Sequence, residues 1–172
     1  MKKNNILLIG FMGVGKGSLA RELVKMTDYF AIDTDDLIES FENRKIKNIF
    51  KVDGESCFRQ LEQRVADWLE RHVENTIIST GGGFFAVENL NRIGTVVYLQ
   101  SDFDVIFEKM MAHPKAEKKI KKRPLFQDPD QARQLLESRR PLYEAKADIT
   151  INVVGKSSAD IAGELLRMVA RC

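Results

Sequence analysis

The chain has 172 residues, of which 44% are hydrophobic and 30% are charged. This is the size and balance of one soluble globular domain with its own core. The net charge of +2 is too small to indicate nucleic acid binding by itself. No apolar stretch approaches membrane-spanning length, and only four apolar residues lie between Lys3 and Gly10, too few for a signal peptide. Cys57 and Cys172 lack metal-ligand spacing, and a reducing cytoplasm is the expected setting. We also expect a monomer without nucleic acid or membrane partners.

A glycine-rich segment near the N-terminus organises the chain. Residues 10–16 read GFMGVGK, the Gly-x-x-x-x-Gly-Lys spacing of a phosphate-binding P-loop. They follow an apolar run of strand length at 6–9 and precede a helical pattern over 18–26, the context that this motif requires. Glycine lets backbone N–H groups approach a phosphate closely, and the start of the helix adds partial positive charge. The sequence therefore predicts a nucleotide site, with Lys16 between the terminal phosphates.

One position departs from the motif. The residue after the lysine is ordinarily Ser or Thr, whose hydroxyl binds Mg²⁺. This chain has Gly17 there, with Ser18 one place later. Either water fills that ligand position, or Ser18 reaches it after a small backbone shift. The alternative to a nucleotide site is a glycine-rich turn that binds nothing, which the strand and helix context disfavours.

Acidic residues end the second predicted strand, at 29–33. Asp33 and Asp35 lie two apart, so they point to one side of an extended segment, at the sheet edge where α/β folds bind ligands. Two carboxylates beside a P-loop suit Mg²⁺ and a substrate hydroxyl. The alternative is that the acidic run only caps a helix at 37–42, which Asp36 could do alone. We favour a functional part for Asp33 and Asp35.

A long helix is predicted from about Gly54 to His72. Arg59 and Glu62 lie three apart on it and are therefore neighbours on one face. Taken alone, this pair is better explained as a surface ion pair worth a few tenths of a kcal/mol. The apolar stripe of the helix predicts core positions at Phe58, Leu61, Val65, Trp68 and Leu69.

Three consecutive glycines, Gly81, Gly82 and Gly83, follow the third predicted strand at 76–80. Glycine loses more backbone entropy on folding than other residues, and a single glycine would be enough for a turn. Three suggest that the backbone lies flat against a ligand and offers its N–H groups as donors. A flexible turn is the alternative.

A lysine-rich segment follows the fourth predicted strand, at 95–99, and the helix at 102–111. Residues 113–127 show no sustained apolar periodicity, which predicts an exposed, mobile loop long enough to be an active-site lid. Most of its lysines are expected to be solvated. Arg123, beside a proline, is the candidate that neutralises charge on a transferring phosphoryl group.

The C-terminal part predicts a helix at 130–144, which Pro141 would kink or shorten. Alternation over 148–153 predicts a fifth strand, and Ser157 or Ser158 caps a last helix. Lys156 ends the loop between them, on the nucleotide side of such folds. Strands alternate with helices throughout, which indicates an α/β fold with a parallel sheet covered on both faces.

In this order, and over essentially the whole chain, the motifs resemble the shikimate kinase family. The resemblance implies a three-layer P-loop kinase fold with a five-stranded parallel sheet, a lid at about 113–127 and a substrate-binding region at about 35–62. It implies ATP- and Mg²⁺-dependent phosphorylation of the 3-hydroxyl of shikimate, on the route to chorismate and aromatic amino acids. It is carried by residues 10–16, 33–35, 49–62, 81–83, 123–125 and 139–143.

The resemblance also implies a part for individual residues. Asp35 would orient the substrate hydroxyl first and act as a general base second, and two arginines would grip the carboxylate with forked donors. Lys109 aligns with an arginine that the family often places against adenine. The implied residues are Asp35, Lys16 and Arg123 for catalysis; Asp35, Arg59, Glu62, Gly81, Gly82, Gly83 and Arg139 for the substrate; Gly13, Val14, Gly15, Lys16, Gly17, Ser18, Lys109, Arg123 and Lys156 for the nucleotide; and Asp33 and Ser18 for the metal.

Three other functions stay open at this point. Another small-molecule P-loop kinase, for gluconate or a nucleoside monophosphate, would not require two arginines facing a carboxylate. A non-catalytic nucleotide-binding module could have lost its metal chemistry through Gly17. A nucleic acid binder could use the lysine-rich segment, but the net charge of +2 and the absence of interleaved aromatics argue against it.

Overall fold

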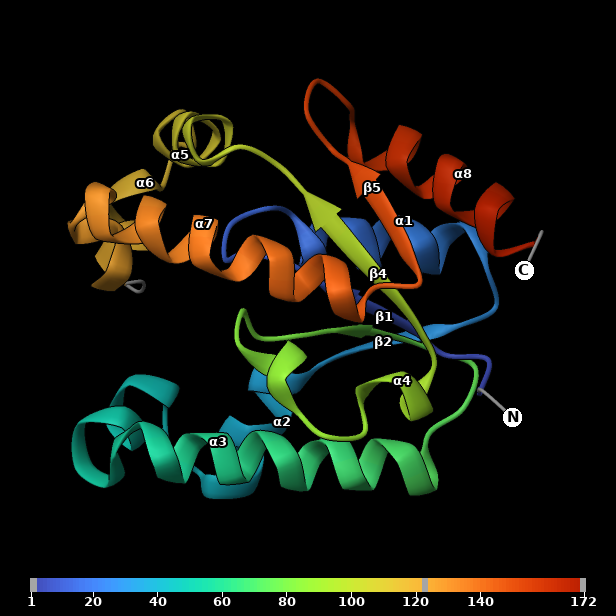
Figure 1. Cartoon of the computed structure of the whole chain (residues 1–172), viewed down its shortest axis with the longest axis horizontal. Coiled ribbons are helices and arrows are strands. Elements are labelled where there is room, and N and C mark those ends of the chain that lie inside the picture. Colours follow the sequence, from blue (N-terminus) through green and yellow to red (C-terminus); the bar gives the residue numbers. More distant parts are fainter. Residues whose placement is uncertain (1–2, 122–123, 171–172) are drawn as a thin grey trace.

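Five strands form one parallel sheet in a computed structural model that describes residues 3–121 and 124–170 (Figure 1). Their order is β2-β3-β1-β4-β5, and helices cover both faces of the sheet. The expected three-layer α/β fold is therefore confirmed. The strands are β1 (Ile6–Ile9), β2 (Phe30–Asp33), β3 (Thr76–Ser79), β4 (Thr95–Gln100) and β5 (Ile149–Asn152).

The helices fall into two layers. One layer, which includes α1, α5 and α8, packs on one face of the sheet, whereas α3 and α4 pack on the other, with α2 beside α3. The helical elements are α1 (Lys16–Met26), α2 (Thr34–Glu42), α3 (Ile46–His72), η1 (Phe84–Ala86), α4 (Leu90–Ile93), α5 (Phe103–Met111), α6 (Ala116–Lys121), η2 (Pro124–Gln127), α7 (Pro129–Lys146) and α8 (Ser158–Val169).

The central strand, β1, is buried along its whole length. Ile6 and Leu8 join the core on the α1 and α8 side, whereas Leu7 and Ile9 join the core on the α3 and α4 side. Successive side chains of a strand point to opposite faces, so a strand covered on both sides needs a continuous apolar run. This run delivers the glycine-rich segment from the middle of the sheet.

The carboxyl ends of three neighbouring strands lie together at one edge. β1 sits between β3 and β4, and β2 pairs with β3 in register from Phe30 with Thr76 to Asp33 with Ser79. The segments that follow β1, β2 and β3 therefore emerge side by side. These are the P-loop, the acidic run and the three glycines, at the edge where such sheets bind ligands.

The segment at 113–127 differs from the predicted loop. It contains the short helix α6 and the 3₁₀ helix η2. Phe126 in η2 is buried against Phe11, Phe103 and Phe107, which anchors the end of the segment to the core. Ile120 and Leu125 also pack against this core, but so few apolar residues in a lysine-rich stretch produce no periodicity that the sequence pattern could reveal.

One further prediction about helices is wrong, and another is wrong in part. Pro141 does not shorten its helix, because α7 runs on to Lys146. The helix has buried residues on both sides of Pro141, Leu136 before it and Tyr143 after it. Trp68, predicted to be in the core, is 45% exposed and lines an open groove between α2 and α3.

The long helix α3 is two helices joined at Gly54, whose φ of 80° and ψ of 175° interrupt the helical conformation. Glycine adopts such a φ without strain, so the break is specified locally. The last predicted helix, α8, begins as expected with Ser157 as its cap, in a capping box with Asp160. Among the described residues, no helix is long and apolar enough to cross a membrane.

Candidate active site

The P-loop wraps around the amino group of Lys16. Gly10, Gly13 and Gly15 all have positive φ, which explains the glycine spacing. Lys16 is the first residue of α1 and only 9% exposed, and its Nζ donates to the carbonyls of Gly10, at 2.7 Å, and Phe11, at 3.0 Å. A buried ammonium held by the loop's own carbonyls is ready to be shared with an anionic ligand. Val14 points its side chain into the core, so only its backbone faces the loop.

Two further cations lie beside this loop. The Lys109 ammonium, from α5, is 3.8 Å from where a Cβ on Gly15 would be. On the next turn of α1, the Arg21 guanidinium is 3.8 Å from where a Cβ on Gly17 would be, and it donates to the Ser18 hydroxyl at 3.3 Å. The structure thus brings Lys109 to the P-loop. Arg21 lies next to Gly17, the position where the motif ordinarily has the hydroxyl of Ser or Thr.

Asp33 caps α2. Its Oδ1 accepts hydrogen bonds from the backbone N–H groups of Asp35, at 2.9 Å, and Asp36, at 3.4 Å, and its Oδ2 accepts one from the Ser79 hydroxyl at 2.8 Å. The expectation that Asp36 could cap this helix alone is therefore wrong. Oδ1 already accepts two hydrogen bonds, whereas Oδ2 accepts one and keeps a lone pair for another donor, such as a water of a hydrated cation.

Asp35 is the most perturbed carboxyl group of the site. Its Oδ1 is buried and has no hydrogen-bond partner among the described residues. Burial, together with the negative charges of Asp33 and Glu62, raises the pKa of Asp35 from 3.8 to about 7, although Lys16 opposes the shift. A carboxyl group with a pKa near neutrality and an available acceptor oxygen is suited to receive a proton from a hydroxyl.

Arg59 and Glu62 form a partly buried pair, in which Glu62 is buried and Arg59 is half-buried. The Glu62 side chain is 2% exposed and accepts from Arg59 Nη1 at 2.5 Å, while Arg59 also donates to the exposed Glu55 at 2.9 Å. Burial raises the pKa of Glu62, against the opposing effect of the Arg59 hydrogen bond. Since Glu62 Oε1 has no partner among the described residues, the pair is only partly satisfied.

The three glycines each face one of these groups. A Cβ on Gly81 would lie 2.7 Å from Asp35 Oδ1 and 3.3 Å from Glu62 Oε1, and one on Gly83 would overlap the Arg59 guanidinium. None of the three has positive φ. A Cβ would collide with charged side chains at Gly81 and Gly83, whereas at Gly82 it would make ordinary contacts. This steric reason is separate from the expected contact of the segment with a ligand, which stays a prediction.

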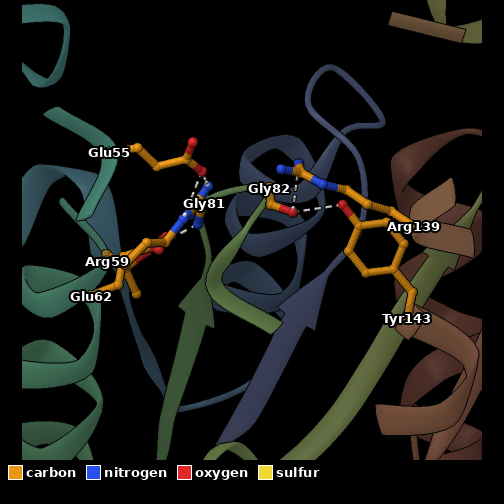
Figure 2. A network of polar contacts seen from close by, with 8 residues as sticks. Glu55, Arg59, Glu62, Gly81, Gly82, Arg139 and Tyr143 are labelled. Atoms are coloured by element: carbon orange, nitrogen blue, oxygen red, sulfur yellow. Dashed lines mark hydrogen bonds and ion pairs between the residues drawn. The ribbon is translucent and has the colours of Figure 1, made fainter. Parts of the chain in front are cut away.

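Gly82 joins the two halves of the site. Its carbonyl accepts from Tyr143 Oη at 2.6 Å and from Arg139 Nη1 at 3.3 Å, and a Cβ on it would lie 3.6 Å from the P-loop nitrogen of Met12. Figure 2 shows Arg59 approaching the glycine segment from α3 and Arg139 approaching it from α7, on the opposite side. Two arginines, one aspartate and the P-loop thus surround Gly81–Gly83.

Some predicted residues lie elsewhere, and some contributors were missed. Lys156 is paired with Glu164 of α8 at 2.6 Å, and Arg123 lies outside the described residues. Sequence reasoning missed Tyr143 and Thr34, whose hydroxyl accepts from the Gly81 N–H at 3.0 Å. Tyr143 could have been found, because it follows Arg139 by four residues and shares its helix face.

Comparisons with known proteins identify the family of this chain. The family model described as shikimate kinase matches residues 12–170. The shikimate kinase of Helicobacter hepaticus is 36% identical over 98% of this chain and 95% of its own, and that of Persephonella marina is 38% identical over 94% and 96%. The solved shikimate kinase of Acinetobacter baumannii in complex with shikimate is 30% identical, with a TM-score of 0.85, over 98% of this chain and 94% of that one.

A gluconokinase from Sinorhizobium meliloti also superposes, with a TM-score of 0.61, but at 15% identity it shares only the fold. The family model and the curated relatives span nearly all of the chain, so the likeness covers both the P-loop and the segments that meet around it. The chain therefore belongs to the shikimate kinase family, the kinases that phosphorylate shikimate with ATP.

Proposed function

We propose that this chain transfers the γ-phosphoryl group of ATP to the 3-hydroxyl of shikimate at the site around Gly81–Gly83. One observation carries the proposal: Arg59 and Arg139 reach this segment from opposite sides, and Asp35 lies against Gly81 (Figure 2). Because gluconate also carries a carboxylate, the match to the shikimate kinase family is what favours shikimate as the acceptor. The Acinetobacter baumannii relative, solved with shikimate bound, supports the same acceptor.

The two arginines form the proposed carboxylate clamp. Guanidinium groups match a carboxylate through paired donors, and such charge-assisted bonds are stronger than neutral ones. Glu62 holds Arg59 Nη1, so the orientation of that guanidinium is set before the substrate arrives. The buried Glu62 also balances part of the positive charge of the clamp.

Asp35 is the proposed partner of the reacting hydroxyl. The hydroxyl oxygen bonds to the γ-phosphorus, the bond from that phosphorus to the bridging oxygen of ADP breaks, and the hydroxyl proton passes to Asp35. Since the transferring group is loose and anionic, positioning contributes more than base strength. Asp35 therefore orients the hydroxyl first and accepts its proton later in the step.

Cations and loop amides stabilise the phosphates in this proposal. The backbone of Gly13, Val14 and Gly15 faces the β- and γ-phosphates, and Lys16 shifts from its loop carbonyls to them. Lys109 of α5, beside Gly15, adds a further positive charge to this region. For Arg123 we retain the role predicted from the sequence. When the segment 113–127 closes, its guanidinium neutralises charge on the transferring phosphoryl group.

The donors present fit Mg²⁺ held mainly through water. No group of three or more His, Cys, Asp or Glu among the described residues could hold a metal by itself. Asp33 and the partnerless oxygen of Asp35 nevertheless offer hard oxygen donors in a cluster of negative charge. Mg²⁺ would screen the phosphates, with Asp33 and, through its hydroxyl, Ser18 holding its waters. Gly17 supplies no ligand.

We also propose that the enzyme works as a monomer in the cytoplasm. The P-loop, Asp35 and both arginines come from one chain, so the proposed site needs no residue from a second copy. The free thiol of Cys57 suits a reducing compartment.

A coupled ADP-release assay tests the proposed function. The enzyme is supplied with Mg²⁺-ATP and with shikimate, gluconate, AMP or no acceptor. Release that depends on shikimate alone is expected. If ATP binds but no acceptor triggers release, the chain is a nucleotide-binding module and the proposal fails; release with gluconate or AMP would reassign the acceptor.

A further inference from the structure

The carbonyl of Gly82 receives two donors from one helix. Tyr143 Oη donates to it at 2.6 Å and Arg139 Nη1 at 3.3 Å, from positions one turn apart on α7 (Figure 2). We propose that Tyr143 is a positioning residue of the acceptor site, whose hydroxyl fixes the peptide between Gly82 and Gly83 and thereby the setting of the carboxylate clamp. This inference rests on the proposed function, because it concerns how shikimate is gripped.

The glycine segment needs such an anchor. The three glycines lack the limits that a Cβ imposes on the backbone. Within the turn, the carbonyls of Gly81 and Gly83 accept from the N–H groups of Phe84, at 3.1 Å, and Ala86, at 3.2 Å, whereas the Gly82 carbonyl accepts from side chains of α7. The steric need for glycine at Gly81 and Gly83 prevents the chain from gaining rigidity by substitution there. The Gly82 carbonyl is therefore held from outside the segment, and Tyr143 supplies the shorter of its two bonds.

Fixing the carbonyl also fixes the N–H group that follows it. A trans peptide is planar, so the N–H of Gly83 points opposite to the carbonyl of Gly82. The carbonyl is directed to α7 by Tyr143, and the Gly83 N–H is therefore directed away from α7. Arg59 lies on the side of the glycine segment away from α7 (Figure 2), with its guanidinium carbon 2.7 Å from where a Cβ on Gly83 would be. Tyr143 thus acts on both sides of the glycine segment although it contacts only one.

Tyr143 is itself rigidly placed. It is completely buried, its ring stacks on Tyr98 with centroids 5.1 Å apart, and Phe85 packs edge-on against it at 4.8 Å. Burial raises its pKa to about 12, so the hydroxyl keeps its proton and stays a donor at working pH. When Arg139 turns to a substrate carboxylate, the Gly82 carbonyl still keeps the Tyr143 hydroxyl.

The neighbouring tyrosine offers a matched control. Tyr98 is also buried and stacks on the same ring, but its hydroxyl has no hydrogen-bond partner among the described residues. Tyr143→Phe and Tyr98→Phe therefore delete the same atom from two stacked rings, and only the first deletion removes a bond to the glycine segment. Both keep the ring, so the core stays filled.

The experiment measures shikimate affinity by calorimetry, and KM and kcat for both substrates, in the wild type, Tyr143→Phe, Tyr98→Phe and Arg139→Ala. For Tyr143→Phe we expect a rise of about three- to ten-fold in Kd and KM for shikimate, the size of one hydrogen bond, with KM for ATP and kcat within about twofold. Tyr98→Phe should match the wild type in all four values.

The outcomes separate the inference from the function on which it rests. If Tyr143→Phe lowers only the melting temperature and leaves shikimate affinity unchanged, while Arg139→Ala weakens it, the positioning part is wrong and the clamp stands. Equal weakening by Tyr98→Phe would show a packing effect and would also overturn the inference. Unchanged affinity in Arg139→Ala would refute the clamp itself.

Discussion

Replacing Asp35 with asparagine should make the protein more stable at neutral pH while it lowers turnover. The carboxyl group is buried beside Asp33 and Glu62, and its pKa is raised from 3.8 to about 7. The folded protein therefore holds this proton more tightly than the unfolded chain does. The contribution of Asp35 to stability is fully present below pH 3.8 and is lost as the pH rises to about 7. Above that pH the folded state carries a buried charge that asparagine lacks.

The size of the effect follows from the pKa. Each pKa unit corresponds to about 1.4 kcal/mol, so full expression of the rise would cost the charged form about 4 kcal/mol. Water entering the site and the Lys16 ammonium screen part of this charge. We therefore expect the free energy of unfolding of the wild type, relative to Asp35→Asn, to fall by about 2 kcal/mol between pH 4.5 and pH 8. For a domain of this size, that corresponds to a melting temperature about 4–8 °C higher, relative to wild type, at pH 8.

The assay is thermal and urea unfolding of wild type and Asp35→Asn without ligands at pH 4.5 and pH 8. Asp36→Asn, an exposed neighbour on the same helix, is the control and should show less than about a quarter of the effect. Turnover of Asp35→Asn with saturating shikimate and Mg²⁺-ATP is measured in parallel. If the stability difference between wild type and Asp35→Asn is the same at both pH values, the burial and charge argument for Asp35 is refuted.

Three other substitutions test the phosphate and carboxylate contacts. Lys16→Ala removes the buried ammonium of the P-loop and should lower kcat by about 100-fold or more in the coupled assay; a near-normal kcat would contradict its part in phosphoryl transfer. Arg139→Ala should weaken shikimate binding by about 2 kcal/mol, since it removes a charge-assisted pair, and calorimetry gives this value directly. Gly17→Ser should lower the Mg²⁺ concentration for half-maximal rate, because it restores the usual hydroxyl ligand. An unchanged Mg²⁺ dependence would mean that water or Ser18 already fills that position.

Local chemistry determined the elements of this fold. The apolar run of β1, the glycine spacing of the P-loop and the alternation that predicts β5 are patterns within a few residues, and each has the expected structure. The same holds for the cap of α8 at Ser157. Where a prediction failed, a distant contact decided the outcome. Phe126 anchors η2 through aromatic rings on other elements, and α7 has buried residues on both sides of Pro141.

The candidate residues of the site could be predicted from the sequence, but not the contacts that explain why each residue stands where it does. The order of motifs along the chain is enough to indicate Asp35, Arg59 and Arg139. It does not show that Gly83 is a glycine because Arg59 occupies the space of its Cβ. Nor does it show that Glu62 is buried beneath Arg59, because i,i+3 spacing is the same on a solvated face and on a covered one.

The sequence by itself determined that this chain is an α/β P-loop protein with an acidic run, a triple glycine and two arginines in a set order. Only the tertiary structure decided that these meet at one sheet edge, where burial raises the pKa of Asp35 and a tyrosine from α7 holds the carbonyl of Gly82. The physical reason is the distance along the chain over which each interaction acts. Backbone geometry and apolar periodicity act over a few residues, whereas desolvation and steric exclusion depend on groups as far apart in the chain as Gly82 and Tyr143, which are separated by 61 positions.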